Sequence, residues 1–527
     1  MRKRFKSISP NVLSILSGVL VVLSFPPLKL GFIAYFALIP FILAFIRDDF
    51  HFGFEKGYIL GVVLNFGILY WLAFNKGTEW YWAFLSMVGA VLFLALNYGV
   101  IGLVFGFVGR RFGSRIALCV LPLIWCSVEY VRSLGTLGFT WNNLCYTQVY
   151  ALPLIQISDV AGSFFISFVV VLTNVVFYNV LFGKDNRGEK LLQVGAVFAV
   201  FLFLNVYGIL AMNKYPSNGC SSRPVRIGVV QPDIDPNEKW SATFYEENLF
   251  TLHSLTDSVA KYGVDLVVWP ETAVPSYLRI NRRGELGWIR RHLSRIGSWL
   301  LTGVPDFEYK NGKYRFYNSA FFISPEQKGE IAYYRKLRLV PFGEYIPLSG
   351  LWPELEHLNL GQGNFQAGKD VTIFKTPLIK NISEARDTIL NFSVAICYES
   401  SFPDIVRKGV LRGAEMLVVI TNDAWFGNTT APYLHAEISR FRAIENRIPV
   451  VRAANTGVSM IVEPTGVVLK KLGFNRRGYI TAELQQGKGD SLYAKFGDWF
   501  SILNVVIVSG LLIYAVISRV YTKREKS

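Results

Sequence analysis

The stretch SVAICYES, residues 393–400, begins as an apolar strand and ends on three chemically active side chains. Val394 to Ile396 continue an apolar run of the kind that forms a buried strand. The run stops at Cys397, which Tyr398 and Glu399 follow directly. Free cysteine commonly packs as a small buried hydrophobe, so core packing is the plain interpretation of Cys397. The rest of the chain must decide between packing and chemistry.

The composition of the 527-residue chain is typical of a membrane protein. Apolar residues make up 52% of the chain and charged residues only 17%. A chain of this length exceeds one ordinary hydrophobic core, so more than one unit is expected. The net charge is +16, but the basic residues form short clusters between apolar runs, which does not favour nucleic-acid binding. The five cysteines and five histidines are scattered, and no nucleotide-binding loop is present, so we expect no metal site, disulfide framework or cofactor.

Apolar runs of near bilayer-spanning length occupy the first 215 residues and recur once close to the C-terminus. They predict a helical membrane bundle over residues 1–215, and a last membrane helix with a cytoplasmic tail over 496–527. The expected spans are residues 11–27, 30–46, 57–75, 82–108, 116–133, 162–182, 191–212 and 498–518.

The basic residues between these runs predict the orientation of the chain. Sixteen Lys and Arg lie on the side that holds both termini, whereas the short loops of the other side hold only Lys29, Lys76 and Arg132. Positive charge is retained on the cytoplasmic side of a membrane. Both termini are therefore expected in the cytoplasm, and the long segment after the seventh run is expected on the extracytoplasmic side.

Several polar residues interrupt the apolar runs, namely Asn65, Asn97, Glu129 and Asp159. Ionisable groups inside a membrane are costly and often functional, which would fit a transporter with an external binding domain. Hydrogen bonding between helices is the plain alternative. The spans show no inverted repeat or paired broken helices, so a transporter is the less favoured hypothesis.

The segment 222–488 changes to alternating strands and helices. Several of its strands, including DLVVWPET and EMLVVITNDAW, are continuous apolar runs typical of a sheet buried on both faces. Helical stretches are expected near 243–262, 283–297, 402–413 and 431–446. This pattern predicts an α/β sandwich in which helices cover stacked sheets.

Three segments of this domain carry a thiol, an ammonium and a carboxylate. VVWPETAVP ends with Glu271 beyond its apolar run, YYRKLRLVPFGEYIP carries Lys336, and Cys397 ends its strand. A carboxylate can activate a thiol as a base, and a nearby lysine can stabilise a thiolate or an oxyanion. Taken singly, Glu271 could be a solvated turn residue and Lys336 part of an exposed basic face. Together the three residues form a plausible acyl-transfer apparatus.

The order Glu271, Lys336, Cys397 resembles the triad of the carbon–nitrogen hydrolase, or nitrilase, superfamily. The phrases WPET, LVPFGEYIP, ICYES, NDAWFG and NTGVS, together with eight expected spans, are similar to the bacterial apolipoprotein N-acyltransferase family. The resemblance covers nearly the whole chain and is specific as a set. It implies a nitrilase-like αββα sandwich joined to the membrane bundle, in the bacterial inner membrane.

The resemblance also implies a role for each of the three residues. Glu271 corresponds to the general base, Lys336 to the stabiliser of the oxyanion and thiolate, and Cys397 to the nucleophile that carries the acyl chain. The implied reaction moves a fatty acyl chain from a membrane phospholipid to Cys397. The chain then passes to the N-terminal amine of a diacylglyceryl-cysteine in an apolipoprotein. A monomeric enzyme in the lipid bilayer is expected.

Five further residues match supporting positions of the family. Glu344 in PFGEY would hold the lysine, Tyr398 would donate a backbone N–H to an oxyanion, and Glu399 lies beside the nucleophile. Trp240 in PNEKW matches a tryptophan on a mobile arm, and Asn318 in YNSA is a weaker match.

Two alternatives concern the acceptor and the protection of the thioester. A membrane-tethered amidase of the nitrilase type, with water as acceptor, would use the same triad. For a transferase, Trp240 and LSGLWPELEHLNL at 348–360 are candidates for an apolar shield against water. Ordinary anchoring to the membrane is the plain alternative for these segments.

Overall fold

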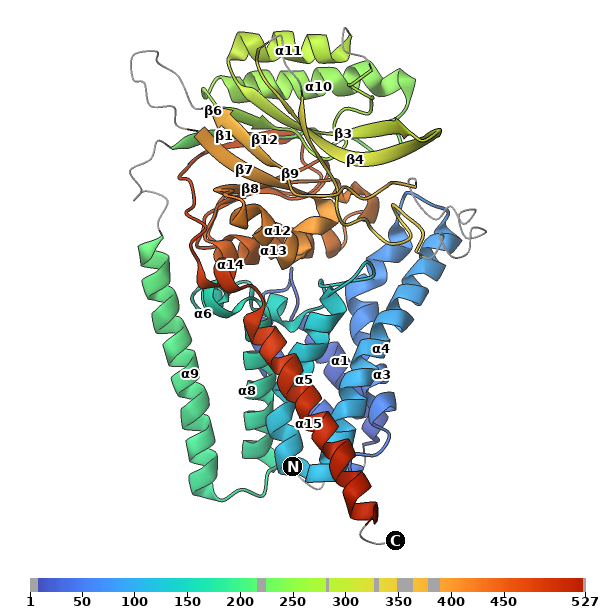
Figure 1. The fold of residues 1–527 in the computed structure, drawn as a ribbon, viewed down its shortest axis with the longest axis vertical. Coiled ribbons are helices and arrows are strands. Elements are labelled where there is room, and N and C mark those ends of the chain that lie inside the picture. The colour runs from blue at the N-terminus through green and yellow to red at the C-terminus, as the bar shows by residue number, and fades with distance from the viewer. Residues whose placement is uncertain are drawn as a thin grey trace. The chain divides into compact units, whose positions relative to one another are not determined.

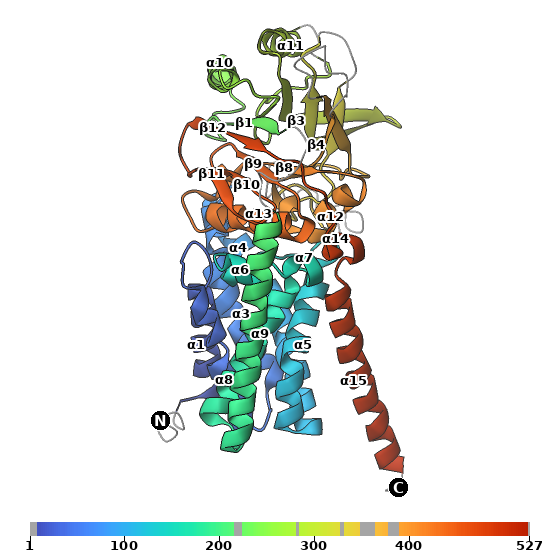
Figure 2. The ribbon, with the colours of Figure 1, turned by 90° about the vertical axis from the view of Figure 1, so that its left-hand side faces the viewer.

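The computed structural model describes residues 8–215, 224–280, 284–326, 331–347, 364–377 and 389–524. The chain divides into two compact units. The first comprises residues 1–72, 84–211 and 496–527, and the second comprises 73–83 and 212–495. Figures 1 and 2 show their elements.

The first unit consists of helices. Its main members are α1 (Pro10–Leu23), α2 (Ile39–Arg47), α3 (Gly53–Leu69), α4 (Trp80–Phe112), α5 (Ser114–Ser133), α8 (Phe164–Phe182), α9 (Arg187–Lys214) and α15 (Trp499–Arg524). Two single-turn helices, α6 (Leu152–Ile155) and α7 (Ser158–Ala161), precede α8. Helix α5 packs against α8 and α15, and α1 packs against α2 and α3.

Within the described residues, six helices are long and apolar enough to cross a membrane: α3 with the turn after it, α4, α5, α8, α9 and α15. The first two expected spans contain shorter apolar helices. The first is α1, with 14 residues, and the second is Gly31–Arg47, which joins a 3-10 helix (Gly31–Tyr35) to α2. Pro26 and Pro27 follow α1, and Pro40 stands at the start of α2. Proline has no amide hydrogen to continue a helix, so an apolar run can exceed the helix inside it.

The polar residues of the first unit serve contacts between its elements. Glu129 of α5 accepts hydrogen bonds from Trp125 Nε1 at 3.0 Å and from the Leu144 amide at 2.8 Å. Asn142 donates to Asn65 at 2.6 Å. These contacts agree with hydrogen bonding between elements rather than with a transport path.

The second unit contains two six-stranded sheets with helices on their outer faces. The first sheet has the order β12-β1-β2-β3-β4-β5, and the second has β11-β10-β9-β8-β7-β6. In the first sheet the bounds are β12 (Gly478–Leu484), β1 (Val225–Gln231), β2 (Leu266–Val268), β3 (Trp299–Lys310), β4 (Lys313–Ile323) and β5 (Ala332–Arg335). In the second they are β11 (Val468–Leu472), β10 (Ser459–Val462), β9 (Val450–Ala454), β8 (Met416–Thr421), β7 (Ile389–Ile396) and β6 (Ile373–Pro377).

Apolar side chains from both sheets share one core. They include Val229, Leu301 and Phe322 of the first sheet and Phe392, Val418 and Ile461 of the second. Figures 1 and 2 show α10 (Ala242–Ala260) and α11 (Glu285–Ile296) outside the first sheet, with α12 (Pro403–Leu411) and α13 (Ala431–Asn446) outside the second. The short helix α14 (Leu492–Phe496) follows the last strand. The predicted αββα sandwich is therefore confirmed.

Helix α11 joins the first sheet through one apolar face. In α11, the buried residues Leu286, Ile289 and Leu293 recur at helical spacing, and they pack in the core between α10, α11 and the first sheet. The strands β1, β2 and β3 run parallel, as do β7, β8 and β9. Residues that follow β2, β7 and β8 are consequently brought to the carboxyl ends of parallel strands, where sites of α/β proteins form.

Candidate active site

Cys397 occupies a strained turn at the end of β7. Its φ is +53°, a left-handed backbone conformation that residues other than glycine rarely adopt. The turn Cys397–Ser401 starts here because the Glu399 carboxylate accepts a hydrogen bond from the Ile396 amide at 2.7 Å. Burial, then the Glu271 carboxylate, raise the pKa of the Cys397 thiol, and the Lys336 ammonium opposes them. The resting sulfur is therefore a thiol that needs a base.

Glu271 lies just after β2, in a segment that continues to run alongside β3. The Gly303 amide of β3 donates to the Pro270 carbonyl at 3.1 Å. A Cβ on Gly303 would lie 2.4 Å from the Thr272 nitrogen and 2.6 Å from the Glu271 Cα, so the close approach requires glycine. Burial raises the pKa of Glu271 above its usual range, although Lys336 acts to lower it. A buried carboxyl with a raised pKa is suited to take a proton from a thiol.

Lys336 follows β5 and points into the protein, with 1% of its side chain exposed. Its Nζ lies 2.8 Å from Glu344 Oε1 and 3.7 Å from Glu271 Oε1. Burial lowers the pKa of Lys336, but the Glu344 and Glu271 carboxylates outweigh burial and raise it overall. One ammonium is thus shared by two carboxylates, which leaves an excess negative charge that favours a proton on Glu271.

Asn318 of β4 joins the two carboxylates. Its Nδ2 donates to Glu271 Oε1 at 2.7 Å and to Glu344 Oε1 at 3.0 Å. The other oxygens of the pair are held by backbone amides: Glu271 Oε2 accepts from Asn422 at 2.9 Å, and Glu344 Oε2 accepts from Val340 at 2.8 Å. Both carboxylates are therefore fixed at each oxygen.

Glu399 ties the turn that holds Cys397 to the segment that holds Lys336. Its Oε1 accepts from the Leu337 amide at 2.6 Å, the Arg338 amide at 3.1 Å and the Tyr334 hydroxyl at 2.8 Å. Burial raises the pKa of Glu399 to about 7, against several hydrogen bonds that lower it. Tyr398 is buried, and its ring meets Phe402 edge to face at 4.8 Å between centroids.

The other two predicted features are the exposed Trp240 and a segment outside the described residues. Trp240 stands in the turn before α10 with 56% of its surface exposed. The segment 348–360 lies outside the described residues.

Two residues of the site were missed by sequence reasoning. Asn422 follows β8 and supplies the amide that holds Glu271. Lys239, next to Trp240, is buried and donates from Nζ to the Glu271 carbonyl at 3.1 Å and to Thr272 Oγ1 at 3.2 Å. Burial lowers the pKa of Lys239 to about 7, while Glu271 acts to raise it. The motif NDAWFG could have signalled Asn422, but no pattern marked Lys239 as buried.

The structure thus gathers Glu271, Lys336, Glu344 and Asn318 by direct contacts, and its electrostatics couple Glu271 and Lys336 to Cys397. A buried thiol that interacts electrostatically with a carboxyl group and a fixed ammonium suits nucleophilic acyl transfer. The arrangement alone does not select the acceptor of the acyl group.

Comparison with known proteins identifies the chain in both units. Residues 226–493 match the carbon-nitrogen hydrolase family, so the second unit is a carbon–nitrogen hydrolase domain. Residues 17–176 match the apolipoprotein N-acyltransferase N-terminal domain. The chain belongs to the apolipoprotein N-acyltransferase family.

Individual relatives cover nearly the full length. The apolipoprotein N-acyltransferase of Geobacter metallireducens is 34% identical over 511 residues, which span 95% of this chain and 94% of that protein. The apolipoprotein N-acyltransferase of Chlorobaculum tepidum is 31% identical over 503 residues, or 90% of each chain. Among solved structures, a variant of the nitrilase-superfamily amidase of Nesterenkonia is similar with a TM-score of 0.36 and 20% identity, over 51% of this chain and 93% of that one.

Proposed function

We propose that the protein transfers a fatty acyl chain from a membrane phospholipid, through a thioester on Cys397, to the N-terminal amine of a diacylglyceryl-cysteine in apolipoproteins. One observation carries the proposal. A buried thiol, carboxyl group and ammonium are coupled in one domain of a chain whose N-terminal unit matches apolipoprotein N-acyltransferases. Both substrates are lipids, which suits an enzyme built on membrane helices.

In the first step Glu271 takes the proton of the Cys397 thiol, and Sγ attacks the ester carbonyl of the phospholipid. A C–S bond forms and the carbonyl oxygen becomes an oxyanion, which Lys336 stabilises by its charge. As the intermediate collapses, the C–O bond breaks and the glycerol oxygen takes the proton from Glu271. The products are acyl-Cys397 and a lysophospholipid.

In the second step the neutral α-amine of the acceptor attacks the thioester. Glu271 takes the proton that the nitrogen loses, the C–S bond breaks, and the same proton returns to Sγ. The product is an amide and the free thiol is restored. A thioester divides one difficult acyl transfer into two easier ones.

The supporting residues receive roles that follow from their contacts. Glu344 and Asn318 hold Lys336 and Glu271 at a fixed separation. Glu399 keeps the Cys397 turn in place, and the backbone N–H of Tyr398 is the second oxyanion donor. Exposed Trp240 contacts the acyl chain of a bound lipid, with its neighbour Lys239 anchored behind Glu271.

An amidase that uses water is the competing function, and the acceptor distinguishes the two. Purified enzyme incubated with phospholipid alone should accumulate acyl-Cys397 in intact-protein mass spectra and release about one lysophospholipid per enzyme. A diacylglyceryl peptide with a free N-terminus should discharge the thioester, whereas the same peptide with an acetylated amine should not. Continuous release of fatty acid without any acceptor would instead establish water as the acceptor.

The orientation proposed for the membrane places both termini in the cytoplasm and the second unit outside it. The excess of Lys and Arg in the loops on the side of the termini supports this orientation. A phosphatase fused after residue 216 is expected to be active, and one fused at the C-terminus inactive. The opposite pattern would reverse the orientation.

Because every site residue comes from a single chain, we propose that the monomer is the active form.

A further inference from the structure

A second buried polar cluster contacts the backbone of Cys397 and has no part in the two reaction steps proposed above. It consists of Asp423, His435 and Arg452, whose side chains are all 0% exposed. Asp423 follows β8, His435 lies on α13 and Arg452 lies on β9. Arg452 NH2 lies 2.7 Å from Asp423 Oδ2 and 3.0 Å from His435 Nδ1.

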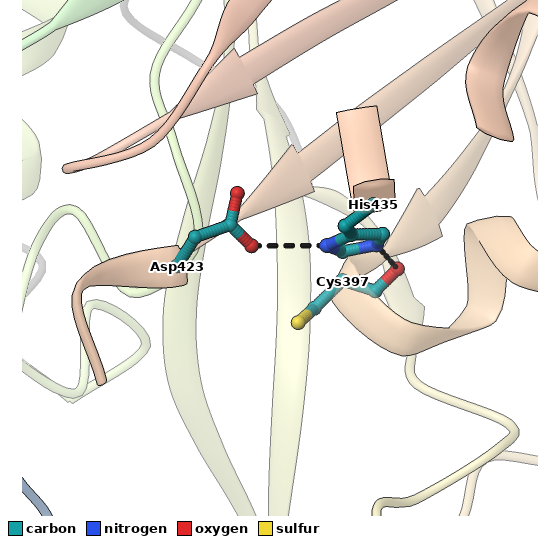
Figure 3. Close-up of side chains that lie close together, drawn as sticks. All are labelled: Cys397, Asp423 and His435. Carbon is teal, nitrogen blue, oxygen red and sulfur yellow. Dashed lines mark hydrogen bonds and ion pairs between the residues drawn. The ribbon is translucent and has the colours of Figure 1, made fainter. Parts of the chain in front are cut away.

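His435 reaches the backbone of the nucleophile. Its Nε2 lies 3.1 Å from the Cys397 carbonyl oxygen, and its Nδ1 lies 2.9 Å from Asp423 Oδ1 (Figure 3). A carbonyl oxygen only accepts hydrogen bonds, so Nε2 carries the proton in this contact. On a neutral ring Nδ1 then accepts from Arg452 NH2 at 3.0 Å, and the same NH2 group binds Asp423 Oδ2 at 2.7 Å, so Arg452 bridges the carboxylate and the ring. The Ser400 hydroxyl donates to the Cys397 carbonyl at 2.9 Å, and its oxygen lies 3.0 Å from Nε2, so it accepts a share of the Nε2–H.

The carbonyl of Cys397 matters because it belongs to the strained residue. A left-handed conformation at a residue other than glycine persists only where its surroundings hold it. The two donors on this carbonyl, His435 and Ser400, fix the peptide plane that follows Cys397. The orientation of that plane sets the direction in which the Cα–Cβ bond of Cys397 points the sulfur.

Two other roles for the cluster disagree with its contacts. A Cys–His–Asp triad needs a ring nitrogen on the thiol. Although Sγ lies within 4.8 Å of the ligand atoms of His435 and Asp423, both ring nitrogens have other partners, Arg452 for Nδ1 and the Cys397 carbonyl for Nε2. The same three residues could in principle hold a metal ion. The Arg452 guanidinium, however, already places a cation against Asp423 and His435.

We propose that His435 is a positioning residue for acyl transfer: its Nε2–H holds the Cys397 carbonyl and thereby keeps the sulfur aimed at the substrate carbonyl, while Asp423 and Arg452 hold the ring. This inference rests on the proposed function, because it concerns the same nucleophile. It adds a group that acts through the backbone of Cys397 and takes no proton from the substrates.

Two substitutions of His435 by amide side chains distinguish the role of Nε2 from that of Nδ1. The nitrogen of His435→Gln falls near the position of Nε2 and keeps a donor for the Cys397 carbonyl. The nitrogen of His435→Asn falls near Nδ1 and keeps a partner only for Asp423. His253→Gln, at another buried histidine of the same unit, is the matched control. The readouts on full-length enzyme in detergent are kcat and KM for formation of acyl-Cys397, the rate of alkylation of Cys397 by iodoacetamide, and the midpoint of thermal unfolding.

His435→Gln should keep kcat within about tenfold of wild type. His435→Asn should lose about 10²-fold in kcat with little change in KM, because a displacement of about 1 Å at a reacting atom costs this much. The alkylation rate should follow the same order, and the control should match wild type. Equal kcat values for the two variants, or a higher value for His435→Asn, would overturn the proposal. So would losses that merely track the unfolding midpoint.

Ser400→Ala tests the role of the hydrogen bonds to the Cys397 carbonyl if neither His435 variant folds. It removes only a hydroxyl, and it should lower kcat and the alkylation rate several-fold with KM unchanged. Wild-type rates in Ser400→Ala would then refute the proposal. If the proposed function itself were wrong, wild-type enzyme would accumulate no acyl-Cys397 on incubation with phospholipid, an outcome distinct from all of these.

Discussion

Cys397→Ala should show no acyl transfer at all while it accumulates in the membrane as a folded protein. The substitution removes the only atom proposed to bond the acyl group, so no covalent path remains. It deletes one small side chain at the end of β7, and single changes of this kind cost roughly 0.5–3 kcal/mol of unfolding free energy. Lysophospholipid release and the intact mass of the protein after incubation with phospholipid are the measurements.

The other described cysteines provide controls for this result. Cys126 and Cys145 are buried, and Cys119 is exposed. Alanine at each of these positions should leave acylation of Cys397 unchanged, as it should at Cys220, which lies outside the described residues. If Cys397→Ala lost its fold together with its activity, the thiol would be a packing residue after all.

Glu271→Gln should form no detectable acyl-enzyme. The glutamine keeps the size of the side chain and an oxygen for Asn318 or Asn422, but it cannot take the thiol proton. Loss of a general base costs about 10²–10⁴ in rate. Lys336→Met should leave a trace of activity, since loss of one oxyanion donor costs about 10²–10³. Acylation at the wild-type level in either variant would refute the role proposed for that residue.

The pH profile of acylation adds an independent check on Glu271. The base acts only when ionised, and burial raises its pKa, so the acylation rate should fall as the pH drops through that raised pKa. The Lys239 cation favours ionised Glu271. Lys239→Met should therefore raise the pKa of Glu271 further and move the acidic limb of the profile to higher pH. A limb that stays in place would mean that another group titrates there.

The sandwich could be predicted from the sequence because the strands of its core are continuous apolar runs. The candidate site could be predicted because reactive side chains stand directly after such runs. Successive members of the set Glu271, Lys336 and Cys397 lie 65 and 61 residues apart along the chain. Glu271 and Cys397 each follow the carboxyl end of a parallel strand, one in each of the two stacked sheets. The basic run RKLR looked like an exposed face. Instead, Arg335 binds Asp306 at 2.9 Å, while Lys336 turns inward.

The contacts that could not be predicted depend on backbone geometry. The amide of Asn422, the strained φ of Cys397 and the carbonyl that His435 meets are invisible in a list of side chains. Lys239 stood in a polar segment, where a lysine is ordinarily solvated, and its burial comes from the turn before α10. The first expected span is longer than its helix α1, because hydropathy does not register the prolines beyond which a helix cannot continue.

The hydrogen bonds of Glu271 and Glu399 cross from one sheet to the other. Glu271 follows a strand of the first sheet and is held by Asn422 beyond the second, while Glu399 joins Ile396 of the second sheet to Tyr334 of the first. The proposed base, Glu271, and the carboxylate that holds the Cys397 turn, Glu399, therefore also join the two sheets of the sandwich. Parting the sheets would break these hydrogen bonds, so the proposed lipid substrate would not gain room in that way. A conformational change that admits a substrate therefore has to occur in the loops around the site.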